Sequence, residues 1–122
     1  MKSLSDYIQD KQTALFDETG AFFAFSNAQF EAKRQPDTVY CGFDGGMVVP
    51  KANAKKLLDG LAAIVDEGIA QDLAENGREA IIRRELANYE CDYTGDITDC
   101  VEALERYDIS AEEINAIFMK RH

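Results

Sequence analysis

Apolar residues recur at helical spacing along most of the chain, and they predict where its helices lie. The strongest repeat runs from Pro50 to Gly77, with a possible first helical position at Pro50 and a stop at Asn76-Gly77. Gly68 predicts a bend or break within it. Its apolar members are Leu57, Leu58, Leu61, Ile64, Val65, Ile69 and Leu73. Weaker repeats predict further helices over 3–18, 27–34, 78–90, 96–107 and from 110 onward.

The predicted helix ends carry residues that satisfy free backbone groups. Ser26 with Gln29, and Ser110 with Glu113, have the spacing of capping boxes. Gly20 suits the left-handed residue that closes a helix. The stretch from Cys91 to Gly95 is expected to be a loop, followed by Asp96 as a helix cap.

Residues 38–43 and 47–49 are rich in strand-forming side chains and flank the turn Asp44-Gly45-Gly46. They predict one β-hairpin, which must pack against helices because an isolated hairpin is only marginally stable. The expected fold is α+β, mainly helical, with about five or six helices and one small β-hairpin. The length of 122 residues suits a single domain over 1–122.

Composition narrows the class of protein. Apolar residues make up 46% and charged residues 30% of the chain, as in folded soluble domains. No apolar run approaches the ~20 residues of a membrane span, and the charged N-terminus lacks a signal-peptide core. We therefore expect a cytoplasmic protein that does not bind a membrane. The net charge of −10 argues against direct binding to nucleic acid, which needs a basic surface.

Almost all of this net charge lies in residues 90–113, which contain nine acidic residues and one basic residue, for a charge of −8. Such a stretch is either a solubilising face or a docking face for a basic partner. The residues expected to make the docking face are called the acidic set: Asp92, Asp96, Asp99, Glu102, Glu105, Glu112 and Glu113.

Catalytic motifs are weak. The only histidine is His122, the last residue, so a Ser-His-Asp or Cys-His site is not expected. Cys41 is better explained as a small apolar side chain in a strand than as a reactive thiol. The glycines around Asp44 have neither the spacing nor the lysine of a phosphate-binding loop. We therefore expect no enzyme, although a deep pocket with perturbed carboxylates would change that expectation.

A metal site is an alternative use of the acidic stretch. Cys91, Asp92 and Asp96 place one thiol near carboxylates, a set that zinc accepts. The spacing is not that of a calcium-binding EF-hand, and the three cysteines lack Cys-x-x-Cys pairing. Zinc held here would stabilise the fold rather than catalyse.

Five segments of the chain are distinctive: residues 7–16, Gly-Ala-Phe-Phe-Ala-Phe-Ser-Asn at 20–27, Arg-Glu-Leu-Ala-Asn at 84–88, Tyr-Thr-Gly-Asp-Ile at 93–97 and Tyr-Asp-Ile-Ser-Ala-Glu-Glu-Ile at 107–114. These segments resemble a family of small phage and prophage proteins of Gram-positive and gut bacteria. The resemblance spans most of the chain but supplies no catalytic residues. Similar proteins tend to carry a histidine where this chain has Tyr89, which argues against a shared histidine-centred metal site unless Cys91 substitutes.

The resemblance implies a phage accessory protein that counters host defence, most closely an anti-CRISPR inhibitor of the RNA-guided nuclease of a type II system. Such nucleases hold nucleic acid in a basic channel, which an acidic surface complements. The expected partner is thus a basic host protein. The alternatives are a zinc-binding accessory protein and, least favoured, an enzyme acting on a small molecule.

Overall fold

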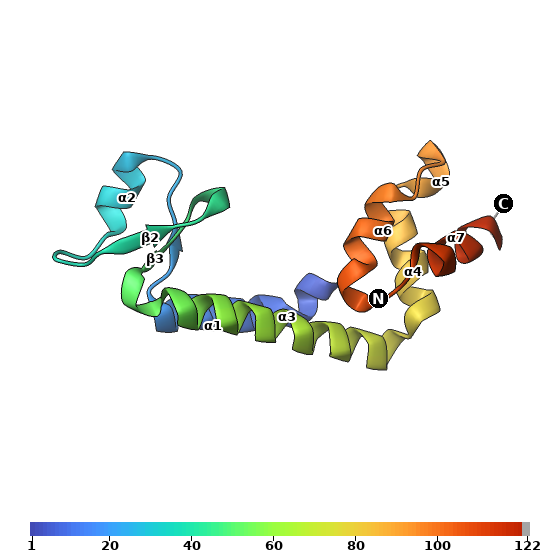
Figure 1. The fold of residues 1–122 in the computed structure, drawn as a ribbon, viewed down its shortest axis with the longest axis horizontal. Coiled ribbons are helices and arrows are strands. Elements are labelled where there is room, and N and C mark those ends of the chain that lie inside the picture. Colours follow the sequence, from blue (N-terminus) through green and yellow to red (C-terminus); the bar gives the residue numbers. More distant parts are fainter. Residues whose placement is uncertain (121–122) are drawn as a thin grey trace. The chain divides into compact units, whose positions relative to one another are not determined.

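The computed structural model describes residues 1–120, so His122 lies outside the described part of the chain. The chain divides into two compact units, Met1–Gly68 (unit 1) and Ile69–His122 (unit 2). One long helix, α3 (Ala54–Asn76), contains the boundary between them (Figure 1).

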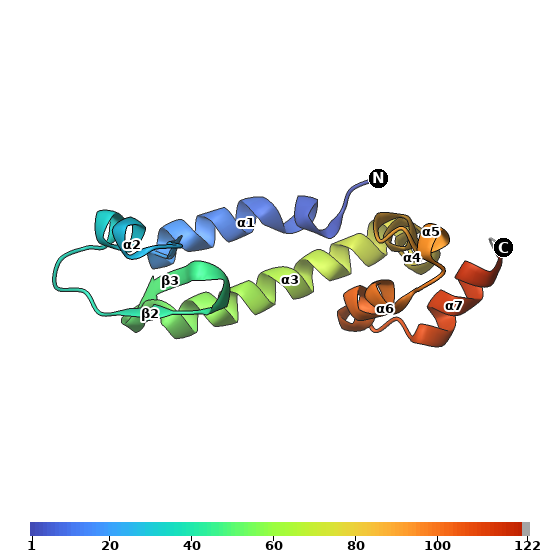
Figure 2. The same cartoon turned by 90° about the horizontal axis from the view of Figure 1, so that it is seen from above.

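Unit 1 is built around two antiparallel helices. α1 (Leu4–Thr19) begins where the Asp6 carboxylate accepts a hydrogen bond from the Ser3 backbone at 2.8 Å, and it ends at Gly20 in the left-handed conformation. Gly68 of α3 lies against Ile8, whereas Gly60 lies against Leu15, so the two helices run in opposite directions (Figure 2).

The three strands of unit 1 form an antiparallel sheet in the order β1-β3-β2. The predicted hairpin is confirmed: β2 (Tyr40–Gly42) pairs with β3 (Met47–Pro50) across the turn at Asp44–Gly46. The sequence did not predict β1 (Phe22–Phe23), which adds to the other edge of β3. A strand of two residues is too short to give an alternating pattern.

One more helix, α2 (Asn27–Lys33), covers the sheet of unit 1 and is capped by Ser26 as predicted. Phe30 of this helix contacts Phe22 and Tyr40, with ring centroids 6.2 and 5.4 Å away. The buried centre of the unit is Leu15, Val49 and Leu57.

Two expectations for α3 are wrong. Pro50 does not begin the helix, because it ends β3 opposite Tyr40, and a 3₁₀ turn (Lys51–Asn53) precedes Ala54. The helix does not break at Gly68 and continues to Asn76. Packing explains this, because Gly68 provides the space in which Ile8 of α1 lies.

Unit 2 continues with α4 (Arg78–Asn88), α5 (Cys91–Thr94), α6 (Thr98–Leu104) and α7 (Ala111–Lys120). The expected loop after α4 is therefore partly wrong, because a short helical turn closed by Gly95 replaces it. The helix expected to reach Tyr107 changes after Leu104 into a 3₁₀ turn (Glu105–Tyr107). The buried residues contributed by these elements include Ile81, Ile82, Leu86, Cys91, Cys100, Leu104, Ile109 and Ile114.

The predicted fold class is confirmed: the protein is α+β and mainly helical, with seven α-helices and one small sheet in residues 1–120. No described helix is both long enough and apolar enough to cross a membrane.

Candidate functional site

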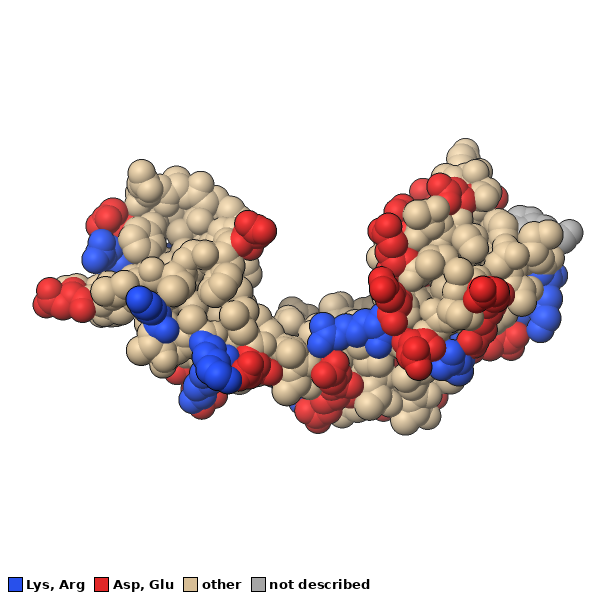
Figure 3. All heavy atoms as spheres, in the orientation of Figure 1, with Lys and Arg blue, Asp and Glu red and all other residues tan. Residues whose placement is uncertain are grey.

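The acidic set is distributed over consecutive short elements of unit 2. α5 carries Asp92, α6 carries Asp99 and Glu102, the following 3₁₀ turn carries Glu105, and α7 carries the last two members. Space-filling atoms show acidic side chains following α5 and α6 along one face of this unit (Figure 3). The acidic side chains of residues 90–113 thus lie on the surface of unit 2.

Asp96 stabilises the start of α6. Its Oδ1 atom accepts hydrogen bonds from the Thr98 backbone N–H at 2.9 Å and from the Thr98 hydroxyl at 2.6 Å. These bonds lower the pKa of Asp96, so its carboxylate stays charged. The predicted cap is therefore one position off: Ile97 occupies the N-cap position, and Asp96 before it binds the first helical residue, Thr98.

Members of the acidic set differ in what they contact. Glu113 is half-buried and receives two hydrogen bonds from Arg78, at 2.6 and 2.9 Å, which lower its pKa. Arg78 also donates to the backbone oxygen of Asp108 at 3.0 Å, which connects α4 to the start of α7. Glu113 thus has a structural role inside unit 2.

Four other members are exposed and take part in no ion pair within residues 1–120: Asp99, Glu102, Glu105 and Glu112. Several cations of unit 2 are engaged elsewhere, because Arg83 and Lys120 both approach Glu79, at 3.6 and 3.8 Å. Residues 69–122 contain 13 acidic and 6 basic residues, against 10 and 7 in residues 1–68. Acidic residues therefore exceed basic residues by seven in residues 69–122, against three in residues 1–68.

The residues proposed as metal ligands lie in different environments. The Cys91 side chain is fully buried, whereas Asp92 and Asp96 are exposed. Within the described residues, no group of three His, Cys, Asp or Glu side chains is arranged to hold a metal ion. Burial and the nearby Cys91 raise the pKa of Cys100 to about 12, so this thiol is protonated at neutral pH. The structure therefore gives zinc no support at Cys91.

The other two sequence features behave as the simpler interpretations predicted. Cys41 is half-buried in β2 and packs against the core of unit 1. The glycines after Asp44 form the hairpin turn, where Gly45 and Gly46 both have positive φ.

A buried polar network was missed by sequence reasoning. Asp72 is 0% exposed, and its two oxygens accept hydrogen bonds from Arg84, both at 2.9 Å. Asn76 donates to the same carboxylate at 2.7 Å, and the Tyr107 hydroxyl donates at 2.5 Å. The Arg84 guanidinium also donates to Glu85 at 2.8 Å. The available signal was an acid three residues after the buried Ile69, on the apolar side of α3.

This network does not provide a catalytic base. Burial favours protonation of Asp72, but hydrogen bonds from Arg84, Tyr107 and Asn76 outweigh burial and hold its pKa below the usual value. Each of its oxygens already has two donors, so no proton-accepting position remains open. The arrangement joins α3, α4 and the 3₁₀ turn after α6 within unit 2.

Comparison with known proteins places the chain in a family without placing it in a functional class. No curated protein and no solved structure matches it. A family of unknown function, DUF7659, matches residues 4–119, a range that includes the acidic set and the Asp72 network. The chain therefore belongs to the DUF7659 family.

Proposed function

We propose that this protein is a binding protein whose acidic set docks on a basic surface of another protein. The observation that carries the proposal is that Asp99, Glu102, Glu105 and Glu112 are exposed and take part in no ion pair within residues 1–120. A basic partner would supply the missing cations.

Electrostatics favours this use of the surface. Uncompensated charges of one sign accelerate encounter with an oppositely charged protein, and salt weakens the attraction. The same charges repel phosphate, so a nucleic acid is a poor direct ligand. The carboxylates of α6 and its 3₁₀ turn also repel one another at helical spacing, by a few tenths of a kcal/mol per pair, and a bound cationic partner would relieve that repulsion.

The partner that we propose is the RNA-guided nuclease of a type II CRISPR system, with this chain acting as a phage-encoded inhibitor in the cytoplasm of the host. Support comes from the resemblance to phage proteins and from the basic channel in which such nucleases hold nucleic acid. An acidic protein seated in that channel would compete with nucleic acid. This mechanism requires no catalysis by the chain.

Charge reversal of three members of the acidic set tests the docking face. We expect Asp99→Lys/Glu102→Lys/Glu105→Lys to weaken binding to a purified type II nuclease by at least about tenfold, because attraction becomes repulsion. Binding would be measured by biolayer interferometry at low and high salt, and inhibition by a DNA cleavage assay. Wild-type binding should weaken as salt rises.

A matched control distinguishes the effect of the acidic set on binding from the effect of net charge alone. Asp10, Asp17 and Asp44 of unit 1 are exposed and take part in no ion pair within the described chain. Reversing these three changes the net charge equally and should leave binding nearly unchanged. Equal losses in both triple variants, or no loss in either, would reject the acidic set as the docking face.

Glu112 and Glu113 give a further control because they are adjacent but differ in their contacts. Glu112→Lys should weaken binding without changing the melting temperature. Glu113→Lys should also lower the melting temperature, because it removes the ion pair with Arg78. Failure of wild-type protein to bind any type II nuclease while still binding another basic protein would reject the nuclease and retain the docking face.

A further inference from the structure

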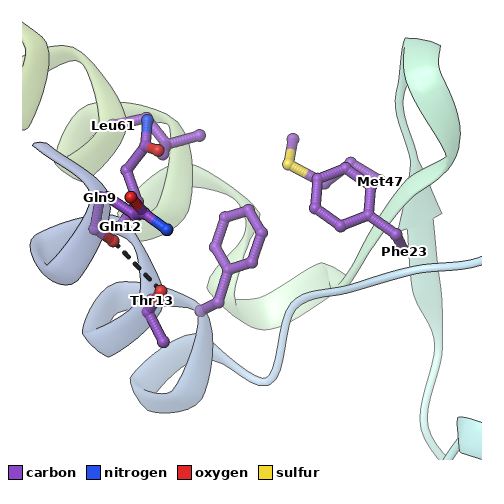
Figure 4. A pocket seen from close by; sticks show the side chains of 7 residues that line it. Gln9, Gln12, Thr13, Phe23, Met47 and Leu61 are labelled. Carbon is purple, nitrogen blue, oxygen red and sulfur yellow. Dashed lines mark hydrogen bonds between the residues drawn. The ribbon is translucent and has the colours of Figure 1, made fainter. Parts of the chain in front are cut away.

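Unit 1 contains an open cavity of about 450 Å³ that the acidic set does not touch. α1 contributes Gln9, Gln12, Thr13 and Phe16, while β1, β3 and α3 contribute one residue each: Phe23, Met47 and Leu61 (Figure 4). Its volume lies within the roughly 300–1,000 Å³ range of small-ligand sites.

The apolar part of the cavity is held in place by the core. Phe16, Met47 and Leu61 pack against the buried residues Leu15, Val49 and Leu57. The rings of Phe16 and Phe23 lie 5.5 Å apart, and Phe23 also stacks on Phe25, whose ring centroid is 6.3 Å away. Phe23 is nevertheless 43% exposed, so its ring is held in place by Phe16 and Phe25 but remains accessible from solvent.

The polar part of the cavity lies on α1, across from Phe23 and Met47 (Figure 4). Gln9 and Gln12 are three residues apart and therefore share one side of the helix. Within residues 1–120, neither side-chain amide makes a hydrogen bond. The Thr13 hydroxyl donates to the Gln9 backbone oxygen at 3.1 Å and keeps its own oxygen free to accept.

The cavity selects against charge, because none of its seven lining residues is ionisable. Lys11, which neighbours Gln12 in sequence, is paired with Glu67 at 2.7 Å. A glutamine amide offers both donors and an acceptor, which matches the N–H and C=O of a peptide group. Aromatic and methionine side chains accommodate a bulky apolar group.

We propose that this cavity binds an uncharged peptide segment that carries one aromatic or branched apolar side chain. The side chain enters between Phe16, Phe23 and Met47, and the peptide groups beside it hydrogen-bond to Gln9 and Gln12. This second docking site is independent of the proposed function, because it shares no residue with the acidic set.

The test is an NMR titration of the full chain with N-acetylphenylalaninamide, a neutral probe that has two amide groups and one aromatic ring. We expect saturable shifts of the Gln9 and Gln12 side-chain amide signals, with a Kd of about 1 mM for a ligand of this size. N-acetylphenylalanine, whose carboxylate would find no cation in the cavity, should bind more weakly. Absence of saturable shifts at the cavity would overturn the proposal.

Matched variants test the polar contacts. Gln9→Leu/Gln12→Leu keeps the size of the side chains and should weaken binding about tenfold, since two hydrogen bonds are lost. Binding to these variants is followed through the backbone amide signals of the lining residues Thr13 and Leu61. Gln71→Leu makes the same change at an exposed position of α3 outside the cavity and should have no effect. Circular dichroism would verify that all variants are folded, and equal weakening by Gln71→Leu would overturn the assignment.

Adenosine separates a peptide site from a nucleobase site, because a base is also planar, uncharged and edged with donors and acceptors. Adenosine should bind more weakly than N-acetylphenylalaninamide. Tighter and saturable binding of adenosine at Gln9 and Gln12 would overturn the peptide assignment.

Discussion

Arg84 of α4 binds both carboxylate oxygens of Asp72 in α3, with two nitrogen–oxygen distances of 2.9 Å. The Asp72 side chain is 0% exposed and that of Arg84 is 12% exposed, so water cannot replace either partner. Breaking a buried pair on one side leaves an uncompensated charge, which is far more costly than losing a surface pair.

We therefore expect Arg84→Met to lower the free energy of unfolding by about 3–5 kcal/mol, measured by urea denaturation. Arg83→Met is the matched control, because Arg83 is exposed and lies 3.6 Å from Glu79; it should cost under about 1 kcal/mol. Combining Arg84→Met with Asp72→Leu should recover part of the loss, since no buried charge remains. If both arginine variants lowered the free energy of unfolding equally, burial would not be what makes the Asp72–Arg84 pair important.

The same carboxylate predicts a dependence of stability on pH. Hydrogen bonds hold the pKa of Asp72 below its usual 3.8 in the folded protein, so the unfolded chain binds a proton at higher pH than the folded chain. The stability contributed by Asp72 is complete above the usual pKa and is lost as pH falls through the lower folded pKa. Between pH 6 and pH 2, the melting temperature of Asp72→Asn should fall less steeply with decreasing pH than that of the wild type.

Gly68 is a point of close contact between α1 and α3. A Cβ atom at this position would overlap the Ile8 side chain. Replacing a helical glycine by alanine usually stabilises a helix by up to about 1 kcal/mol, whereas overpacking costs about 1–3 kcal/mol. We expect overpacking to dominate, so Gly68→Ala should lower the melting temperature. Gly42→Ala, which places its Cβ in open space, should change it little; a higher melting temperature for Gly68→Ala would contradict close packing.

Much of this fold could be predicted because its signals are local. The capping of α2 by Ser26, the end of α1 at Gly20 and the hairpin around Asp44 depend on neighbours in sequence. The failures depend on distant partners. The pairing of Pro50 with Tyr40 is not visible in a periodic pattern, so the sequence predicts Pro50 in a helix. The break predicted at Gly68 is absent for the same reason, since the packing partner Ile8 is 60 residues away along the chain.

The candidate sites also divide into features that depend on neighbouring residues and features that depend on distant ones. The charge of the acidic set could be read directly, and the structure adds which members are exposed and which, like Glu113, are paired. The Asp72 network and the cavity beside Gln12 escaped sequence reasoning because each combines residues from several elements. Uncharged cavity-lining residues also have no distinctive spacing.

Thiol reactivity provides an independent test of unit 2. Cys91 and Cys100 are fully buried, and the pKa of Cys100 is raised to about 12, so little thiolate is available. Ellman's reagent at pH 8 should modify both slowly in the native protein and rapidly in guanidinium chloride. Half-buried Cys41 should react first. Rapid native labelling of Cys100, identified by mass spectrometry, would contradict its burial.

The order of the elements has a consequence for how quickly each unit acquires its structure. α4 to α7 follow one another with short connections, and the buried network of unit 2 joins Asp72 to residues 12 and 35 positions away in the chain. In unit 1, by contrast, Ile8 must meet Gly68, 60 residues away in the chain, before α1 and α3 can pack. Chains rich in local contacts fold faster than those that must close long loops. In stopped-flow refolding of single-tryptophan variants, Tyr89→Trp should therefore report an earlier phase than Tyr40→Trp, and simultaneous phases would show that the units fold together.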